Sequence, residues 1–364
     1  MIIFATIVFS FLILRFTISL YNFITVTYNK PSTLCYSGNK KVSILVPARN
    51  EEDNLINLLD SIIEQRYTNF EILVYNDESE DNTLLILKNY EIIDKRIQVI
   101  NGTGCPAGWT GKNNACHQLS LKATGDYYIF LDADVRLASN FLDIVIEEMT
   151  LNQYKLLSYF PSQVMNSTGE WLTIPLMNWI LQSLLPLNLV EKTSFKSLSA
   201  ANGQCMMFEA KSYTEQQWHF KVNSSCVEDI EIAQKAKELD YKVSVKLGTQ
   251  LIYCKMYSSF KEAVNGFSKN ILHYFPGKIF GAILFMFLIF AIPILSIVSI
   301  PLFIVALFLI IIQRILISYS ANQNIIKNLR WHIPQMISFV FIISKAIAQK
   351  KNKKLQWKGR TISI

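Results

Sequence analysis

Short apolar runs alternate with longer amphipathic stretches through the part of the chain that follows residue 40. The apolar runs have the length and composition of strands buried on both faces of a parallel sheet, and they cover residues 41–47, 70–75, 96–100 and 127–131. The stretches between them place apolar residues at helical spacing over residues 53–65, 81–93 and 113–123. This alternation predicts an α/β fold with a mostly parallel sheet.

Two far more apolar stretches flank this region. Residues 279–318 carry one charged residue, Arg314, in forty positions, which is enough for two membrane-spanning helices of ~20 residues each. Residues 299–301 (Ser-Ile-Pro) predict a tight turn between them, and a buried helix pair in a soluble core is disfavoured because no polar stripe is present. Residues 2–28 are interrupted only by Arg15 and predict an uncleaved N-terminal anchor, because they lack the basic start and the cleavage site of a signal peptide.

Two shorter apolar stretches are too short or too polar to predict a span directly. Residues 333–348 form a sixteen-residue stretch followed by the basic sequence KKNKK, which favours a segment that lies in the membrane interface or re-enters it. A further span would place those lysines on the side opposite the α/β region, against the positive-inside rule. Residues 171–190 predict either a helix that touches lipid or a buried helix.

The charge is unevenly distributed along the chain. Only 17% of the 364 residues are charged, against roughly 25% in soluble domains, and the apolar content excludes a disordered chain. The net charge is +7, but residues 263–364 hold twelve basic residues and no acidic one, so the other 23 basic and 28 acidic residues leave residues 1–262 at −5. The basic tail therefore indicates contact with anionic membrane lipid and a cytoplasmic body, and it does not indicate nucleic-acid binding.

The cysteines and histidines follow no metal or disulfide pattern. No C-x-x-C pair occurs, and the four histidines are isolated from one another and from the cysteines. We interpret the cysteines as free thiols in a reducing compartment. They are Cys35, Cys105, Cys116, Cys205, Cys226 and Cys254.

Polar clusters directly follow each of the predicted strands. In an open α/β sheet ligands bind at the carboxyl ends of the strands, so these clusters are expected to share one edge. Any one of them is also explained as a helix N-cap, but four at consecutive strand ends favour a site for a nucleoside diphosphate. The clusters are residues 47–52, 76–81, 102–112 and 132–134.

Carboxylates within these clusters suggest metal chemistry. Asp132 and Asp134 would repel each other in one cleft unless a cation joined them, and a hard divalent ion such as Mg²⁺ or Mn²⁺ would bridge them to phosphate oxygens. Lys112 could add positive charge to that group. Further along, Glu228 and Asp229 precede a helical run, where they act either as an N-terminal capping pair or as a general base. No dinucleotide fingerprint or P-loop accompanies them.

Taken together, these motifs resemble those of the family 2 glycosyltransferases with the GT-A fold, over residues 40–275. A Met-Tyr-x-Ser sequence at residues 256–259 and a closing Trp-Lys-Gly-Arg at residues 357–360 resemble a membrane-bound branch of that family. The motifs shared with the family are VSILVPARNEE (42–52), YNDESEDNT (75–83), GWTGKNNAC (108–116), FLDADV (130–135), ANGQCMMF (201–208) and VEDIEIAQ (227–234).

The resemblance implies a role for each matched residue. Nucleoside contacts fall to Pro47, Ala48, Arg49, Glu51 and Asp77. Asp132 would lie near the ribose and the metal, Asp134 would hold the metal, and Lys112 would approach the diphosphate. Asn202, Gly203 and Gln204 would border the donor sugar and the acceptor, while Asp229 would be the catalytic base with Glu228 beside it.

The resemblance also implies a domain layout. It comprises a GT-A nucleotide-sugar-binding domain with a mostly parallel mixed sheet at residues 40–275, and transmembrane helices on both sides of it. The N-terminal anchor would occupy residues 1–28, a transmembrane hairpin residues 279–318, and an interfacial or re-entrant segment with a basic cytoplasmic tail residues 319–364. The protein would be a multi-pass cell-membrane enzyme with a cytoplasmic catalytic domain.

The expected activity is an inverting transfer of a hexose, glucose from UDP-glucose, onto a membrane lipid. The end-to-end layout resembles the branch whose acceptor is a carotenoid acid. Diacylglycerol, a hopanoid or ceramide-like lipid, a polyprenyl phosphate and a glycan remain alternative acceptors, and a non-catalytic membrane scaffold remains an alternative of another class.

Two positions and one missing motif depart from the family pattern. Glu78 follows Asp77 where the family usually has a small residue such as glycine, and Lys255 stands where related chains often have arginine. No convincing Q-x-x-R-W sequence precedes the membrane region. These departures leave the cation that contacts the diphosphate open, and they argue against a processive polymer synthase.

Overall fold

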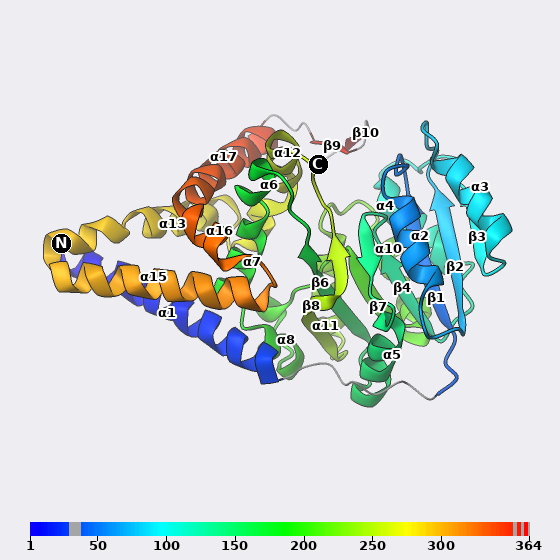
Figure 1. Cartoon of the computed structure of the whole chain (residues 1–364), viewed down its shortest axis with the longest axis horizontal. Coiled ribbons are helices and arrows are strands. Elements are labelled where there is room, and N and C mark those ends of the chain that lie inside the picture. Colours follow the sequence, from blue (N-terminus) through cyan, green and yellow to red (C-terminus); the bar gives the residue numbers. More distant parts are fainter. Residues whose placement is uncertain (29–37, 352–354, 358–359, 363–364) are drawn as a thin grey trace.

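A mixed sheet of eight strands lies at the centre of the body in the computed structural model, which describes residues 1–28, 38–351, 355–357 and 360–362 (Figure 1). The strand order is β3-β2-β1-β4-β7-β6-β8-β5. The strands are β1 (Val42–Ala48), β2 (Phe70–Asn76), β3 (Ile97–Asn101), β4 (Tyr127–Leu131), β5 (Val135–Leu137), β6 (Leu156–Gln163), β7 (Cys205–Glu209) and β8 (Val243–Cys254).

The strand pairing is parallel in the first half of the sheet and mixed in the second. β1 pairs in parallel with β2 and β4, and β2 pairs in parallel with β3. β7 is antiparallel to both β4 and β6, whereas β6 and β8 are parallel and β5 is antiparallel to β8. The predicted mixed, mostly parallel sheet is confirmed, and its parallel half carries the strands that the apolar runs predicted.

Helices cover both faces of the sheet, which explains why its strands are almost continuously apolar. On one face α2, α3 and α5 share a buried core with Ile44 and Val74, and on the other α4, α9 and α11 share a core with Leu45 and Leu73. The helices of the body are α2 (Leu55–Ile63), α3 (Thr83–Ile93), α4 (Gly111–Ser120), α5 (Phe141–Asn152), α6 (Thr168–Trp171), α7 (Pro175–Leu184), α8 (Leu187–Lys192), α9 (Ala210–Gln216), α10 (Trp218–Lys221), α11 (Glu228–Glu238) and α12 (Phe260–Asn270), with 3₁₀ turns η1 (Lys196–Leu198) and η2 (Ile271–Tyr274).

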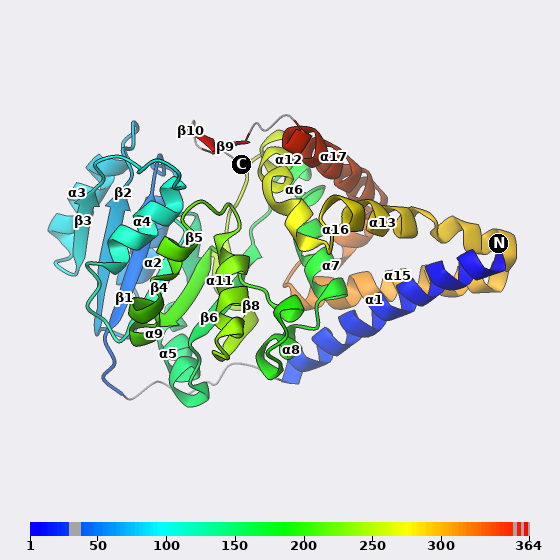
Figure 2. The same cartoon turned by 180° about the vertical axis from the view of Figure 1, so that it is seen from behind.

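Three helices form a long apolar arm that extends away from the body (Figures 1 and 2). By length and composition, α1 (Ile2–Tyr28), the stretch Ile279–Val298 and α15 (Ile300–Ser320) could each cross a membrane. The predicted turn lies between the last two, where the Ser299 hydroxyl accepts a hydrogen bond from the Leu302 N–H and caps α15. The arm contains α13 (Ile279–Phe290), η3 (Ile292–Ile294) and α14 (Leu295–Val298), and it continues into α16 (Ile325–Arg330) and α17 (His332–Lys351).

The two shorter apolar stretches lie where the arm meets the body. Residues 171–190 include α7, which is largely buried and contacts α1 and α15, so the buried-helix interpretation holds for it. α17 packs against α12 and buries Phe339, Ile342 and Ile343. β9 (Leu355–Trp357) and β10 (Arg360–Ile362) form a short antiparallel pair, while Cys35, Lys358 and Gly359 lie outside the described residues.

Candidate functional site

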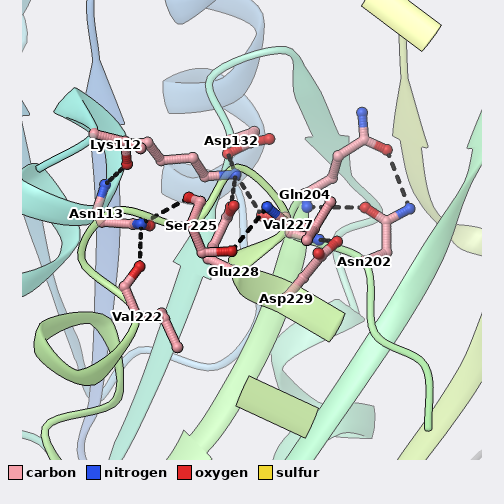
Figure 3. Close-up of polar contacts among 12 residues, drawn as sticks. Lys112, Asn113, Asp132, Asn202, Gln204, Val222, Ser225, Val227, Glu228 and Asp229 are labelled. Atoms are coloured by element: carbon pink, nitrogen blue, oxygen red, sulfur yellow. Dashed lines mark hydrogen bonds and ion pairs between the residues drawn. The ribbon is translucent and has the colours of Figure 1, made fainter. Parts of the chain in front are cut away.

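Charged side chains from three separate segments meet at the edge of the sheet near the carboxyl end of β4 (Figure 3). Lys112 lies in the first turn of α4, which starts where the Thr110 hydroxyl accepts a hydrogen bond from the Asn113 N–H. Its Nζ is 2.8 Å from Oδ1 of Asp132, which follows β4, and 3.1 Å from Oε1 of Glu228, which begins α11. The sequence predicted each of these residues as a site residue, and the fold brings them together.

The lysine is held firmly in its charged form. Burial alone would lower the pKa of Lys112, but the carboxylates of Asp132 and Glu228 raise it well above its ordinary value. Its Nζ also donates a hydrogen bond of 3.3 Å to the carbonyl oxygen of Gly203, which lies two positions before β7. Lys112 therefore cross-links the three chain segments that border the site.

Asp229 lies on the other side of Gly203. Its Oδ2 accepts a hydrogen bond of 3.0 Å from the Gly203 N–H, and its Oδ1 accepts one of 2.8 Å from the Ile230 N–H. Burial raises the pKa of Asp229 to about 7, and the neighbouring Glu228 carboxylate adds to this effect. A carboxyl group with that pKa exchanges a proton readily near neutral pH, which is the property a general base requires.

Asp134 is a second carboxyl group with a displaced pKa. Burial raises its pKa to about 7, and the like charges of Asp132 and Glu51 contribute as well. Its Oδ1 atom is buried and has no hydrogen-bond partner within the described residues. No group of three His, Cys, Asp or Glu side chains in the described ranges is arranged as a complete metal site.

Residues 202–204 connect the chain after β4 to β6 and β8 through hydrogen bonds. Gln204 accepts a hydrogen bond at its carbonyl oxygen from the Asp132 N–H, at 3.2 Å, and donates from Nε2 to the Cys254 sulfur at 2.8 Å. Asn202 donates its backbone N–H to the Ser158 hydroxyl, and its Oδ1 accepts from the Gln204 N–H. Both amide side chains are buried, so they shape the floor of the site more than its opening.

The predicted nucleoside contacts form a second group at the ends of β1 and β2. Pro47 and Ala48 are the last residues of β1, not part of the following loop. The buried Arg49 donates from Nη1 to the carbonyl oxygen of Asp77 at 2.7 Å and lies 3.9 Å from its carboxylate. Glu51 accepts a hydrogen bond from Asn54 at 2.8 Å.

The loop after β2 explains one departure from the family pattern. Glu78 has a φ of 53°, in the left-handed region that glycine adopts without a steric cost. The family pattern implies a small residue at this position, and this chain places a glutamate in the left-handed turn.

A cavity of about 400 Å³ opens next to this loop. It lies between the ends of β2 and β3 and the start of α4, and Tyr75, Asn101, Gly104, Cys105 and Asn114 contribute to its wall. Gly102 is required beside it, because a Cβ atom there would come within 2.8 Å of the Tyr75 hydroxyl. Tyr75 and Asn114 were not predicted as individual site residues, although both lie within the family motifs at residues 75–83 and 108–116.

Two tyrosines near the carboxylates were also missed as individual site residues. Burial and the nearby Asp229 carboxylate raise the pKa of Tyr274, which lies in η2. Burial is likewise the main cause of the raised pKa of Tyr257, to which Tyr274 and Asp134 contribute. The Met-Tyr-x-Ser motif was the available signal for Tyr257, whereas Tyr274 is identified only by the packing of η2.

The family model for glycosyl transferase family 2 matches residues 43–215. A 4,4'-diaponeurosporenoate glycosyltransferase of Staphylococcus haemolyticus is 27% identical over 261 residues, which cover 67% of this chain and 66% of that protein. One from Staphylococcus aureus is 36% identical over 129 residues, covering 35% of this chain and 31% of that protein. The chain thus matches less than two thirds of the length of these relatives.

The mannosyltransferase PcManGT from Pyrobaculum calidifontis, solved in complex with GDP-Man and Mn²⁺, has a similar fold. Its TM-score is 0.57 at 14% identity, and the match covers 96% of this chain and 100% of that one. The central sheet and its covering helices therefore have the GT-A arrangement. Residues 43–215 match the family model and form a family 2 glycosyltransferase domain.

Proposed function

We propose that this protein is a membrane-bound inverting glycosyltransferase that moves one hexose, glucose from UDP-glucose, onto a lipid acceptor. The observation that carries the proposal is the convergence of Lys112, Asp132, Glu228 and Asp229 around Gly203. The named staphylococcal relatives support 4,4'-diaponeurosporenoate, a carotenoid acid, as the acceptor in staphyloxanthin-type pigment synthesis.

The donor nucleotide would bind across the ends of β1, β2 and β4. The cavity beside Tyr75 is large enough for a base, and Asp77, which accepts a hydrogen bond from Arg49, follows the same strand. Lys112 pairs with Asp132 and Glu228, and its charge would meet the diphosphate there. Pro47, Ala48 and Glu51 would line the nucleoside side, and Asn202, Gly203 and Gln204 the sugar side.

The residues present fit a divalent cation. Asp134 has a buried oxygen without a partner, and the like charges of Asp132 and Glu51 act on it. An Mg²⁺ or Mn²⁺ ion held by Asp134 and Asp132 would relieve this repulsion, as hard cations prefer carboxylate oxygens. When bound, such an ion stabilises negative charge on a departing diphosphate. The complex of PcManGT with Mn²⁺ supports this choice of cofactor.

Asp229 would act on the acceptor. The acceptor oxygen would form a bond to the anomeric carbon as the bond from that carbon to the UDP oxygen breaks, and Asp229 would take the acceptor proton. The Gly203 and Ile230 N–H groups fix the orientation of its carboxylate. A carboxylic acid acceptor is already ionised at neutral pH, so Asp229 would matter less for it than for an alcohol.

The apolar arm would bring the site to its acceptor. α1, Ile279–Val298 and α15 would lie in the cell membrane, with α17 at its interface and the body on the cytoplasmic side. Anionic lipid would attract the basic residues of the C-terminal region, each worth about 1 kcal/mol close to the surface. The acceptor would then reach Asp229 laterally from the bilayer.

The direct test supplies the purified full-length protein with labelled UDP-glucose and a panel of membrane acceptors. We expect label to transfer to the carotenoid acid, and Asp134→Ala to abolish transfer to every acceptor. Asp126→Ala serves as the matched control, because that aspartate pairs with Lys40 on an exposed surface. Transfer only to diacylglycerol, a hopanoid, a ceramide-like lipid or a polyprenyl phosphate would show that this lipid, and not the carotenoid acid, is the acceptor. Absence of both UDP-sugar binding and transfer would support a non-catalytic scaffold.

A further inference from the structure

Two arginines from different helices of the arm are buried against the same tryptophan. Arg15 of α1 is 2% exposed and Arg314 of α15 is 1% exposed. The guanidinium carbons lie 4.3 Å (Arg15) and 5.5 Å (Arg314) from the centre of the Trp179 ring of α7. This pair lies outside the glycosyltransferase site, and the transfer chemistry does not use it.

The protein neutralises neither charge. Arg15 donates from Nε and Nη2 to the Ser183 hydroxyl, and Arg314 donates from Nε to Nδ1 of His332, at distances of 2.9–3.2 Å. The Nη2 of Arg314 is buried without a hydrogen-bond partner in the described part of the chain. No ion pair joins either arginine to a carboxylate within the described residues.

The sequence excludes an acidic partner from the helices that surround the pair. α1, α7, α13, α15 and α17 contain no Asp or Glu. The acidic residues closest in sequence to Trp179 are Glu170 and Glu191. Glu170 accepts a hydrogen bond from the Ser167 backbone, and Glu191 accepts one from the Tyr154 hydroxyl. Burying two guanidinium groups without a counter-charge is costly, and arginine does not deprotonate to avoid the cost.

The position of the pair along the arm indicates where a counter-ion would come from. On the far side, residues 2–14 and 300–312 are almost entirely apolar. On the side of the body, the same helices carry buried polar groups, among them Ser19 and Gln313, which hydrogen-bond to each other at 3.2 Å. The arginines therefore lie where the arm changes from apolar to polar, which is the level of lipid head groups on a membrane-inserted helix.

We propose that Arg15 and Arg314 form a binding site for the anionic head group of a membrane amphiphile. A carboxylate or a phosphate monoanion offers the paired oxygens that a guanidinium fork binds. The apolar tail of the amphiphile would lie along the arm, where Leu14 and Phe308 are exposed. The site shares the membrane placement proposed above and is independent of sugar transfer.

The test compares the full-length protein with Arg314→Met in micelles of an uncharged detergent. Thermal unfolding and native mass spectrometry are followed while phosphatidylglycerol, oleate, phosphatidylcholine or inorganic phosphate is added. For the wild type we expect retained lipid and a higher Tm with phosphatidylglycerol, oleate or both, and no effect of phosphatidylcholine or inorganic phosphate. A response to one of the two anionic amphiphiles alone identifies phosphate or carboxylate as the ligand group.

The variants distinguish binding from a purely structural role. Arg314→Met should weaken binding of the anionic amphiphile at least tenfold, and in uncharged detergent its Tm should equal or exceed that of the wild type, because an unpaired buried charge is gone. Arg330→Met, which removes an exposed arginine stacked on Trp331, should bind as the wild type does. Equal binding by Arg314→Met, equal loss in Arg330→Met, or an equal response to inorganic phosphate would overturn the proposal. Arg314→Lys, which retains the charge without the fork, should bind with intermediate affinity.

Discussion

Nζ of Lys112 lies 2.8 Å from Oδ1 of Asp132 and links the first turn of a helix to the end of the central strand β4. The two residues are twenty positions apart in the sequence, and each comes from a motif that on its own has an ordinary structural explanation. Their contact places the positive charge that a diphosphate needs beside the carboxylate proposed to lie near the metal.

Lys112→Met should weaken donor binding. The substitution removes the cation while leaving Asp132 and Glu228 close to each other, so the site becomes more repulsive to a diphosphate. We expect the dissociation constant for UDP-glucose to rise at least tenfold, about 1.4 kcal/mol, and the Tm to fall. Isothermal calorimetry and thermal unfolding measure the two effects. Lys196→Met is the matched control, since its pair with Glu238 lies on the exposed surface, and a donor affinity equally weakened in that control would exclude a local role for Lys112.

Asp229→Asn should discriminate between acceptors. With an alcohol acceptor the loss of the base should lower kcat roughly 10²–10⁴-fold, whereas a carboxylate acceptor should lose far less because it carries no proton to remove. Steady-state rates with a carotenoid acid and with diacylglycerol provide the comparison. The same fractional loss with both acceptors would show that Asp229 acts by another route, for instance by positioning Gly203.

The pH dependence of the reaction should follow Asp229. Burial and Glu228 raise the pKa of Asp229 to about 7, and the base is active only when ionised. With an alcohol acceptor, kcat/KM should therefore rise with pH up to about 7 and level off above it. With a carboxylate acceptor this rise should be much weaker. Profiles that coincide for the two acceptor types would assign the titration to another group.

Asp134→Asn should stabilise the metal-free protein while it abolishes transfer. Burial raises the pKa of Asp134 from its ordinary value of 3.8 to about 7, so the contribution of this group to stability is fully present below 3.8 and is lost progressively as pH rises to about 7. The variant lacks this loss, and we expect its Tm to exceed the wild-type value by about 2 °C or more above pH 7, with a smaller difference at pH 5. Thermal unfolding in EDTA at both pH values measures this, and a variant that is less stable at both would refute the destabilising effect of the buried Asp134 carboxylate.

Glu78→Gly should stabilise the loop after β2. A left-handed backbone costs a non-glycine residue ~1–2 kcal/mol, and the extra entropy of an unfolded glycine offsets part of that, so we expect a net gain of ~0.5–1 kcal/mol at φ 53°. Denaturant unfolding measures the free energy. Gln153→Gly, at φ 56° after α5, is the control for the same backbone effect away from the site. Glu78→Val should destabilise, and a neutral valine would contradict the left-handed conformation.

The local pattern of the sequence was sufficient for most of the elements in the first half of the sheet. Buried parallel strands are apolar on both faces, so residues 41–47 and 127–131 stood out, and the structure has strands at Val42–Ala48 and Tyr127–Leu131. Residues 299–301 were identified as a turn because a proline and a capping serine interrupt an otherwise apolar stretch. The motifs predicted the family as well, since their order along the chain reflects the order of strands.

The antiparallel half of the sheet was harder to predict. β7 lies between β4 and β6 although 73 residues separate it from β4 in the chain, and no local signal encodes such a pairing. The structure thus supplies the position of Gly203, whose backbone atoms contact both Lys112 and Asp229. These contacts depend on long-range packing, not on the residues that surround Gly203 in the sequence.

By itself the sequence determined which residues are apolar, which carry charge and where turns interrupt the pattern, because these are properties of neighbouring residues. It therefore predicted the family 2 domain, the apolar arm and the candidate carboxylates. Only the tertiary structure decided which charges lie close together. Lys112 pairs with Asp132 and Glu228, while Arg15 and Arg314 both pack on the Trp179 ring with no carboxylate partner within the described residues. Electrostatic energy depends on distance in space and on burial, and neither quantity can be read from separation along the chain.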